Sequence, residues 1–225
     1  AEIHYEIHGN GMAAGEEFKG CIYIVSDGGE LKLPCRIQVE APFAMTSMGK
    51  IRNLFHFANL VRNHYEEAKR LFLSSDFADI FLVTNPHACA VYEILKDSVC
   101  TDTAMEEFLV SVHKKSRVML TIGEDRQEYP EFEHTVGNTI TLSKSGWGYL
   151  SIEIKVDGDF IKLERNTLTS GDFSGSIYPL FYTIEEDKVH AGKNFGRIFI
   201  VTPYQELCVE IYVEKYRDSV KRVKT

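Results

Sequence analysis

Histidine and carboxylate side chains are the first candidates for chemistry, because together they bind metal ions. His4 and His8 stand near the start of the chain, and His64 is followed by Glu66 and Glu67. On a strand, an i, i+4 spacing would leave the first two imidazoles on one face but about 13 Å apart. Neither H-E-x-x-H nor a two-histidine, one-carboxylate pattern occurs. We therefore interpret these histidines as surface residues and predict no metal ligand.

Serine and glycine motifs give two further candidates, and neither has the spacing that its chemistry needs. Residues 171–175 read Gly-Asp-Phe-Ser-Gly, which differs from the G-x-S-x-G of a serine nucleophile and lacks a strand-to-helix context. Gly9, Gly11 and Gly15 do not follow the G-x-G-x-x-G spacing of a phosphate-binding turn. We predict a loop at 171–175 and a connection between strands at Gly15.

Carboxylates cluster at three places where an acid–base pair could form. The clusters are Glu66-Glu67, Glu106-Glu107 and Glu185-Glu186-Asp187. Glycoside hydrolysis needs two carboxyls across a cleft, and the sequence singles out no such pair. We expect solvated helix faces or turns, with no catalytic residue, no cofactor and no enzymatic activity.

Aromatic residues in the last third of the chain are the remaining candidates for ligand contact. They are Trp147, Tyr149, Tyr178, Tyr182, Tyr204 and Tyr212. Exposed coplanar rings could bind sugars, which makes a carbohydrate-binding module one alternative. We prefer packing in a core or at its rim, because large aromatic side chains mostly bury area. The ligand-binding residues stay unassigned.

The cysteines indicate neither a disulfide framework nor a zinc site. They are Cys21, Cys35, Cys89, Cys100 and Cys208. Their number is odd, their spacing is wide and no C-x-x-C occurs. We interpret them as small buried hydrophobic residues. Reduced thiols favour a cytosolic location slightly.

The composition is that of a folded chain. Its 225 residues include 25 Lys and Arg against 33 Asp and Glu, giving a net charge of −8, and 44% are hydrophobic. This apolar content excludes a disordered chain, and the acidic balance argues against a general nucleic-acid binder. No apolar run approaches the roughly 18 residues of a membrane span. The chain starts at Ala1 and not at Met, so we expect a fragment or a processed product.

Glycine placement predicts a helical middle between two β-rich ends. Residues 50–122 contain no glycine and only one proline, Pro86, and glycine is costly inside helices. Apolar residues there recur at helical spacing: Ile51, Leu54, Phe55, Ala58, Val61, then Tyr65, Ala68, Leu71, Phe72, then Phe77, Ile80, Phe81, then Val91, Ile94, Leu95, then Met105, Phe108, Leu109, Val112. Four or five helices in a small bundle are predicted.

Capping residues predict where these helices begin. Thr46 or Ser47 could cap the first helix, and Asn85 followed by Pro86 marks a later start. Thr103 with Glu106 has the spacing of a capping box. A break is expected near Asn63.

A β-hairpin is predicted ahead of the helices. Apolar and polar residues alternate from Leu31 to Val39, and a strand with Ile22 and Ile24 precedes them. Gly28 and Gly29 would form the two-residue tip. In that register Cys35 faces Ile22 and Cys21 lies opposite Arg36, so a disulfide between the two cysteines is disfavoured. A three-residue loop would instead bring the two sulfurs together.

The two ends of the chain repeat one pattern. Residues 3–18 align without gaps with residues 180–195. Further matches follow in order: Gly20 with Gly196, Ile22 with Ile198, Ile24 with Ile200, Leu31 with Leu207, Ile37 with Ile211, Val39 with Val213. The first copy carries only the closing strands of the pattern. Its apolar face must therefore pack on the helices, on the second copy or on residues outside this sequence.

The second copy has further strands before it, at 118–122, 139–142, 150–156, 160–163 and 177–184. About seven strands result, the number of an immunoglobulin-like sandwich. We predict an α+β chain in four parts: 1–44, the last strands of a first immunoglobulin-like sandwich; 45–115, a helical bundle; 116–216, a complete second sandwich; and 217–225, a linker or the start of a helix.

The order of motifs along the chain resembles a known family. Residues 50–60 (Lys-Ile-Arg-Asn-Leu-Phe-His-Phe-Ala-Asn-Leu), 106–110 (Glu-Glu-Phe-Leu-Val), 113–115 (His-Lys-Lys) and 146–149 (Gly-Trp-Gly-Tyr) carry the resemblance. Together they look like an uncharacterised bacterial domain-of-unknown-function family of long proteins, in which immunoglobulin-like segments precede a helical-repeat tail. The resemblance covers nearly the whole chain and implies architecture, with no catalytic residues.

The function expected from these observations is that of a non-catalytic interaction or scaffold segment of a larger bacterial protein. Its partner would be protein, including the rest of its own chain, with carbohydrate as the alternative. An enzyme with a site where helices meet the second sandwich is the third hypothesis. No nucleic-acid partner and no membrane span in this segment are expected.

Overall fold

The computed structural model describes residues 4–6, 8 and 11–216. The chain divides into two compact units, one up to Asp97 and one from Ser98, and each is described by itself. The four-part division predicted above stays a prediction. No helix among the described residues is long and apolar enough to cross a membrane.

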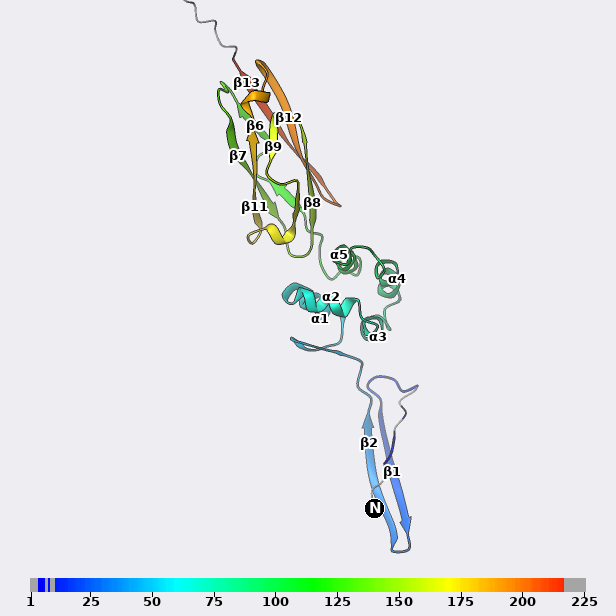
Figure 1. Ribbon diagram of the computed structural model, residues 1–225. Helices are drawn as coiled ribbons and strands as arrows, with labels where there is room; N and C mark the ends of the chain where they lie inside the picture. The colour runs from blue at the N-terminus through cyan, green and yellow to red at the C-terminus, as the bar shows by residue number, and fades with distance from the viewer. Residues whose placement is uncertain (1–3, 7, 9–10, 217–225) are drawn as a thin grey trace, which may run out of the picture. The chain divides into compact units, whose positions relative to one another are not determined.

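The first unit holds two small antiparallel sheets followed by four helices (Figure 1). Its elements are β1 (Glu17–Ser26), β2 (Gly29–Gln38), β3 (Ala44–Thr46), β4 (Gly49–Ile51), α1 (Leu54–Asn63), α2 (Tyr65–Phe72), α3 (Asp76–Phe81) and α4 (Pro86–Leu95). The predicted break near Asn63 is confirmed. The strand on which the spacing of His4 and His8 was considered is not formed at residues 4–6 and 8, and the neighbouring residues 1–3, 7, 9 and 10 lie outside the described part.

Local cap chemistry fixes where two of these helices begin. The Asn85 side chain accepts a hydrogen bond from the Ala88 N–H with Pro86 at the first turn, which confirms that prediction. Asn53 caps α1 through the His56 N–H. The expectation of Thr46 or Ser47 as its cap was wrong. The Thr46 hydroxyl instead donates to the Gly49 carbonyl and closes the β3–β4 turn.

Aromatic rings fill the space between the helices of the first unit. Phe57, Phe72 and Phe77 are fully buried. Phe77 meets Phe57 edge to face at 4.9 Å and Phe72 at 5.1 Å between ring centroids. The Tyr92 hydroxyl donates to the Phe72 carbonyl at 2.8 Å, so the polar end of this ring is satisfied inside the core.

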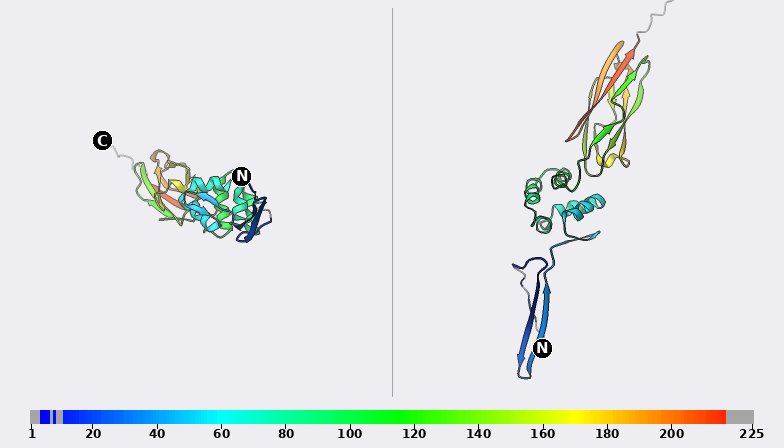
Figure 2. Two further views of the ribbon diagram at one scale, coloured as in Figure 1. Left: turned by 90° about the horizontal axis from the view of Figure 1, so that it is seen from below. Right: turned by 180° about the vertical axis from the view of Figure 1, so that it is seen from behind.

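The second unit is a helix followed by a β-sandwich (Figure 1; Figure 2 shows the sandwich from two other directions). Its elements are α5 (Thr101–Ser111), β5 (Leu120–Ile122), β6 (Arg126–Tyr129), β7 (Val136–Lys144), β8 (Ser151–Asp157), β9 (Ile161–Leu163), β10 (Thr167–Thr169), β11 (Ile177–Ile184), β12 (Gly192–Val201) and β13 (Glu206–Lys215), with short 3-10 turns at Ser170–Asp172 and Glu186–Lys188.

The sandwich consists of a five-stranded sheet, β10-β8-β12-β13-β6, and a four-stranded sheet, β5-β7-β11-β9. β5 pairs with β7 in one sheet, and β6 pairs parallel with β13 in the other. The consecutive segments β5 and β6 therefore contribute to different sheets. This arrangement is immunoglobulin-like, and the chain as a whole is α+β.

The prediction of about seven strands missed β6 and β10. β6 is a short edge strand in which Arg126 and Glu128 are exposed. β10 has three residues, of which Leu168 is buried. Segments this short show no apolar alternation that a sequence pattern could detect.

The sandwich core follows from the two-residue period of its strands. Ile198 and Ile200 on β12, and Val209 and Ile211 on β13, are fully buried. Their neighbours in the sequence, such as Arg197 and Tyr212, point to the other face of the sheet. The long strands β12 and β13 thus present one apolar face to the opposite sheet.

The hairpin β1–β2 forms, but its predicted register was wrong. Ser26 pairs with Gly29, which leaves Asp27 and Gly28 as the tip, and Ile22 pairs with Leu33 instead of Cys35. The cause is local, because the Ser26 hydroxyl accepts from the Gly28 N–H and donates to the Gly29 carbonyl.

The predicted capping box of α5 was also wrong. The helix begins one turn earlier than expected, with Cys100 at its N-cap, and the Thr103 hydroxyl donates to the Cys100 sulfur at 3.3 Å. Glu106 lies buried inside the unit instead of capping the helix.

Candidate interaction surfaces

The hairpin β1–β2 presents one face with no charged residue, which we call the open face. Because side chains alternate along both strands, the open face consists of Phe18, Gly20, Ile22, Ile24, Leu31, Leu33, Cys35 and Ile37. Leu31 is 54% exposed and Leu33 is 43% exposed. No third strand among the described residues pairs with this sheet.

The opposite face of the hairpin is polar and carries its own ion pairs. Glu17 pairs with Lys19 at 3.0 Å and with Arg36 at 2.7 Å. The Lys32 ammonium lies 5.2 Å from the centre of the Tyr23 ring. These charges suit a solvated surface, so the two faces of the hairpin differ sharply in chemistry.

The two cysteines of the hairpin lie on different faces. Cys21 pairs with Pro34 on the polar face, whereas Cys35 pairs with Gly20 on the open face. Both thiols are free, and the interpretation of the cysteines as buried residues was wrong, because Cys21 and Cys100 are exposed and the other three are half-buried. The expectation that no disulfide joins them survives the change of register.

A buried ion pair fastens α5 to the sandwich within the second unit. Lys115 pairs with Glu106, and their side chains are only 2% and 4% exposed. The Tyr149 N–H donates to the second carboxylate oxygen of Glu106 at 3.1 Å. The Lys115 ammonium also lies 4.7 Å from the Trp147 ring centre. The expectation of a solvated Glu106 was therefore wrong.

Burial works against both charges of this pair. Desolvation raises the pKa of Glu106 above its ordinary value, although the Lys115 ammonium acts in the other direction. Desolvation lowers the pKa of Lys115, against the effect of Glu106. Gly148 makes the arrangement possible: a Cβ there would lie 1.9 Å from the Lys115 Nζ and 2.5 Å from a Glu106 oxygen.

The same junction holds a second carboxylate. The Tyr204 hydroxyl donates to Glu107 at 2.5 Å, and the Arg117 guanidinium lies 4.8 Å from the Tyr204 ring centre. Burial and the Glu107 carboxylate raise the pKa of Tyr204. The hollow beside Glu106 and Tyr204 has only about 10 Å³, about the least that a water molecule needs. Trp147, Tyr149 and Tyr204 thus take part in contacts of this junction.

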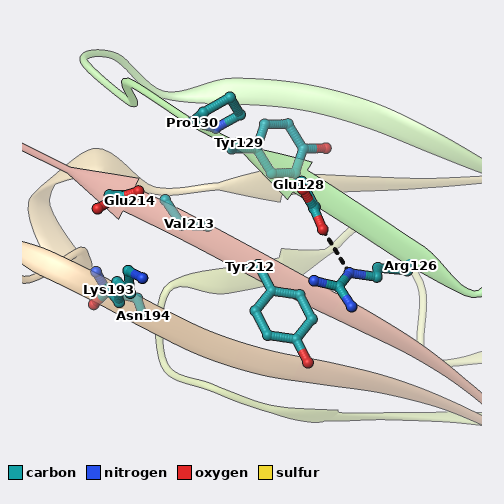
Figure 3. A pocket seen from close by; sticks show the side chains of 9 residues that line it. All are labelled: Arg126, Glu128, Tyr129, Pro130, Lys193, Asn194, Tyr212, Val213 and Glu214. Carbon is teal, nitrogen blue, oxygen red and sulfur yellow. Dashed lines mark ion pairs between the residues drawn. The ribbon is translucent and has the colours of Figure 1, made fainter.

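A shallow groove lies on the outer face of the five-stranded sheet (Figure 3). Its side chains come from β6, β12 and β13, and they include Arg126, Glu128, Asn194 and Tyr212. The Arg126 guanidinium lies 4.3 Å from the Tyr212 ring centre, and Phe195 meets Tyr212 at 5.0 Å with a tilt of 52°. These two rings do not form the flat platform that a stacked sugar requires.

The other sequence candidates lie apart from one another. His4 and His8 are exposed, and neither lies in a strand. Ser174 is in a loop and forms an isolated bridge with Ile177. Tyr182 is buried in the sandwich, with its hydroxyl 2.6 Å from that of Tyr129. Among the described residues, no three His, Cys, Asp or Glu side chains lie close enough to hold a metal ion.

The comparison with protein families decides the affiliation of the chain. Residues 1–225 match the N-terminal model of a family of unknown function, DUF5717. The chain belongs to the DUF5717 family. This agrees with the resemblance to an uncharacterised domain family found in the sequence. No curated protein matches the chain.

Three solved structures similar to this DUF5717 chain each cover less than half of it. The E. coli chaperone DraB matches at 11% identity and a TM-score of 0.34, over 43% of this chain and 55% of DraB. A PapD-like domain of human CEP192 matches at 10% identity and a TM-score of 0.34, over 44% and 87%. The C. elegans MSP family member WR4 matches at 10% identity and a TM-score of 0.33, over 42% and 97%. The chain thus spans about half the length of DraB, and likenesses at these scores carry no argument about function.

Proposed function

We propose that this chain is a non-catalytic interaction segment of a larger bacterial protein, and that the open face of β1–β2 is its binding surface. The observation that supports the proposal is the combination of an uncharged apolar face with a sheet in which the described residues supply two strands. Such a hairpin is marginally stable alone in water, and contiguous exposed apolar surface is typical of interaction sites.

The hypothesis of an enzyme with a site at the junction of α5 and the sandwich has less support than the interaction function. Glu106 and Lys115 have the residue types of an acid–base pair, but they bind each other in a buried position, and the Lys115 ammonium lies against the Trp147 ring. The adjacent hollow of about 10 Å³ is far smaller than the several hundred cubic ångströms of a substrate site. We assign this pair to holding α5 in place.

Paired charge variants test the proposed surface. Leu33→Asp places a carboxylate on the open face, and Tyr23→Asp places the same charge on the polar face of the same hairpin. Burying an unpaired carboxylate costs several kcal/mol. Leu33→Asp should therefore reduce the partner recovered with the full chain on the order of tenfold or more, measured by quantitative affinity capture. Tyr23→Asp should leave it unchanged, and equal recovery with both variants would contradict the proposal.

Carbohydrate binding is a second candidate, supported by one exposed aromatic ring, although its tilt against the neighbouring ring gives no flat platform. Phe195 is 46% exposed, and its ring centre lies 5.0 Å from that of Tyr212, which lines the groove of Figure 3. Should this groove bind sugars, Tyr212→Ala would abolish signals that the full chain gives on a glycan array. An array without signals would remove this candidate.

A further inference from the structure

The hairpins β1–β2 and β12–β13 pair their strands in the same register. Each residue of the first hairpin corresponds to a residue of the second at a constant difference in residue number. Gly20 pairs with Cys35 as Gly196 pairs with Ile211, and Ile24 pairs with Leu31 as Ile200 pairs with Leu207. The correspondence runs through both strands without an insertion. This pairing replaces the alignment made from the sequence, which matched Ile37 with Ile211 and therefore had to skip two residues in the second strand.

The turns of the two hairpins also correspond. The Ser26 hydroxyl accepts from the Gly28 N–H at 3.3 Å and donates to the Gly29 carbonyl at 3.3 Å. The Thr202 hydroxyl accepts from the Tyr204 N–H at 3.2 Å and donates to the Gln205 carbonyl at 3.3 Å. The same pair of hydroxyl hydrogen bonds therefore sets the strand register in both hairpins.

Corresponding positions differ in what covers them. Ile198, Ile200, Val209 and Ile211 are fully buried by the opposite sheet of the sandwich. Their counterparts are Ile22, Ile24, Leu33 and Cys35, and all belong to the open face. The first hairpin thus has the face of a sandwich strand pair, and no second sheet pairs with or extends it among residues 4–6, 8 and 11–216.

We propose that the open face receives the strands of a partner polypeptide that complete an immunoglobulin-like sandwich, with one partner strand running antiparallel along β1. This inference rests on the proposed function and names the partner for that surface. The occupant is a half-sandwich with the strand pattern of β5 to β11, not a helix and not a second copy of the hairpin. The uncharged open face matches the apolar inner face of such a sheet.

Gly20 supports a sheet as the occupant. In β12, a Cβ on Gly196 would lie 2.6 Å from Ile161 Cδ1 and 2.9 Å from Phe160 Cζ, so glycine admits these side chains. Gly20 occupies the corresponding position, where a Cβ would meet the Cys35 sulfur at 3.4 Å and no other described residue within 4 Å. Glycine weakens a strand unless another chain approaches closely. We infer that Gly20 makes room for a bulky side chain of the partner.

The edges of the hairpin show where a strand can be added. β12 pairs antiparallel with β8 through Arg197 to Val201, and the corresponding residues 21–25 of β1 contain no proline. On the other edge, the Glu210 N–H donates to the Asp125 carbonyl at 2.8 Å. Pro34 stands at the position corresponding to Glu210 and has no N–H to donate. The strand is therefore added along β1.

A strand graft within the full chain tests the equivalence. Residues 16–25 replace 192–201 and residues 30–39 replace 206–215, while the native turn 202–205 stays. The matched control shifts both grafts by one residue, using 17–26 and 31–40, which turns the apolar face outward. The first graft should keep cooperative unfolding of the second unit, and the shifted graft should lose it. If the first graft unfolds no more cooperatively than the shifted one, the proposal is overturned.

Thiol labelling tests the occupant without changing the strands. In the purified chain, maleimide should label both Cys21 and Cys35. In cells that make the protein, labelling of Cys35 should fall on the order of tenfold relative to Cys21, because a covered thiol reacts only through local opening. Cys35 that stays reactive in cells overturns the proposal whatever the graft shows. Purified chains that self-associate and protect Cys35 also overturn it, because the occupant is then a second copy.

The two proposals fail in different ways. If Leu33→Asp releases no partner, the interaction function itself is wrong. If Leu33→Asp releases a partner but Cys21 is protected together with Cys35, the interaction stands and completion of a sandwich does not.

Discussion

The hairpins β1–β2 and β12–β13 share their strand lengths, their register and their turn chemistry, yet one face is a core and the other is a surface. Each of their four strands has ten residues. Ile200 is fully buried, whereas Leu31, which belongs to the corresponding face, is 54% exposed. An apolar strand face therefore specifies burial but not what buries it. The following variants test how far the two hairpins differ.

The largest expected effect is on the free energy of unfolding, when the buried ion pair between α5 and the sandwich is broken. An exposed ion pair of the first hairpin serves as the comparison. Lys115→Ala leaves the Glu106 carboxylate buried without its cation and should lower the free energy of unfolding by about 3–5 kcal/mol. Arg36→Ala removes an exposed partner of Glu17 and should cost about 0–1 kcal/mol. Denaturant unfolding of the full chain measures both. Similar losses would show that the hairpin is packed as firmly as the sandwich.

The same variant has a predicted pH dependence. Burial already raises the pKa of Glu106, and removing Lys115 takes away the group that opposes this shift. A carboxyl with a raised pKa in the folded state contributes stability at low pH that is lost as pH rises through that pKa. The loss of unfolding free energy caused by Lys115→Ala should therefore become smaller as pH falls from neutral toward the ordinary Glu pKa of 4.5. A deficit that does not change with pH would argue that this carboxylate is hydrated.

Corresponding isoleucines should respond differently to truncation. Ile200→Ala leaves a cavity in the sandwich core and should cost about 2–5 kcal/mol. Ile24→Ala on the open face of the isolated chain should stay within about 0.5 kcal/mol. Calorimetry of the full chain gives both values. A loss at Ile24 as large as at Ile200 would mean that the open face is already covered.

Corresponding glycines give a smaller difference of the same kind. Gly196→Ala forces a Cβ against Ile161 and Phe160 and should cost about 1–3 kcal/mol. Gly20→Ala brings a Cβ into ordinary contact with the Cys35 sulfur at 3.4 Å and should be neutral or slightly stabilising in the isolated chain, since glycine is unfavourable in strands. The Gly20→Ala chain should bind the partner more weakly than the unchanged chain does. If Gly20→Ala binds the partner as tightly as the unchanged chain, then no partner side chain lies close to Gly20.

The smallest effect concerns two thiols outside the first hairpin, Cys100 and Cys208. Hydrogen bonds from Thr103 lower the pKa of Cys100, whereas burial raises the pKa of Cys208 on β13. Near neutral pH, iodoacetamide should therefore alkylate Cys100 faster than Cys208, as peptide mass spectrometry can measure. Replacing Cys100 by Ser gives a cleaner background for comparing Cys21 with Cys35. Equal rates at both sites would show that access and not ionisation controls labelling.

Local chemistry was predictable from the sequence because its causes lie within a few residues. Asn85 and Pro86 specify a helix start wherever the helix packs, and the alternation from Leu31 to Val39 specifies a strand. The register of β1–β2 was not found, because the Ser26 hydroxyl competes with the glycine pattern of the turn. Glu106 was assigned to a cap because its spacing from Thr103 fits one. Its actual partner, Lys115, follows α5 and meets it only after the chain has turned back.

The amino-acid sequence alone was enough to establish the α+β class, the helical middle and the likeness of the two ends, because periodicity and cap chemistry act locally. The exact pairing of the strands, the burial of Glu106 with Lys115 and the role of Gly148 in admitting them became evident only in three dimensions, as did the different fates of corresponding apolar faces. Burial depends on packing between segments that are distant in the sequence. An apolar pattern is the same whether its cover comes from nearby strands or from another polypeptide.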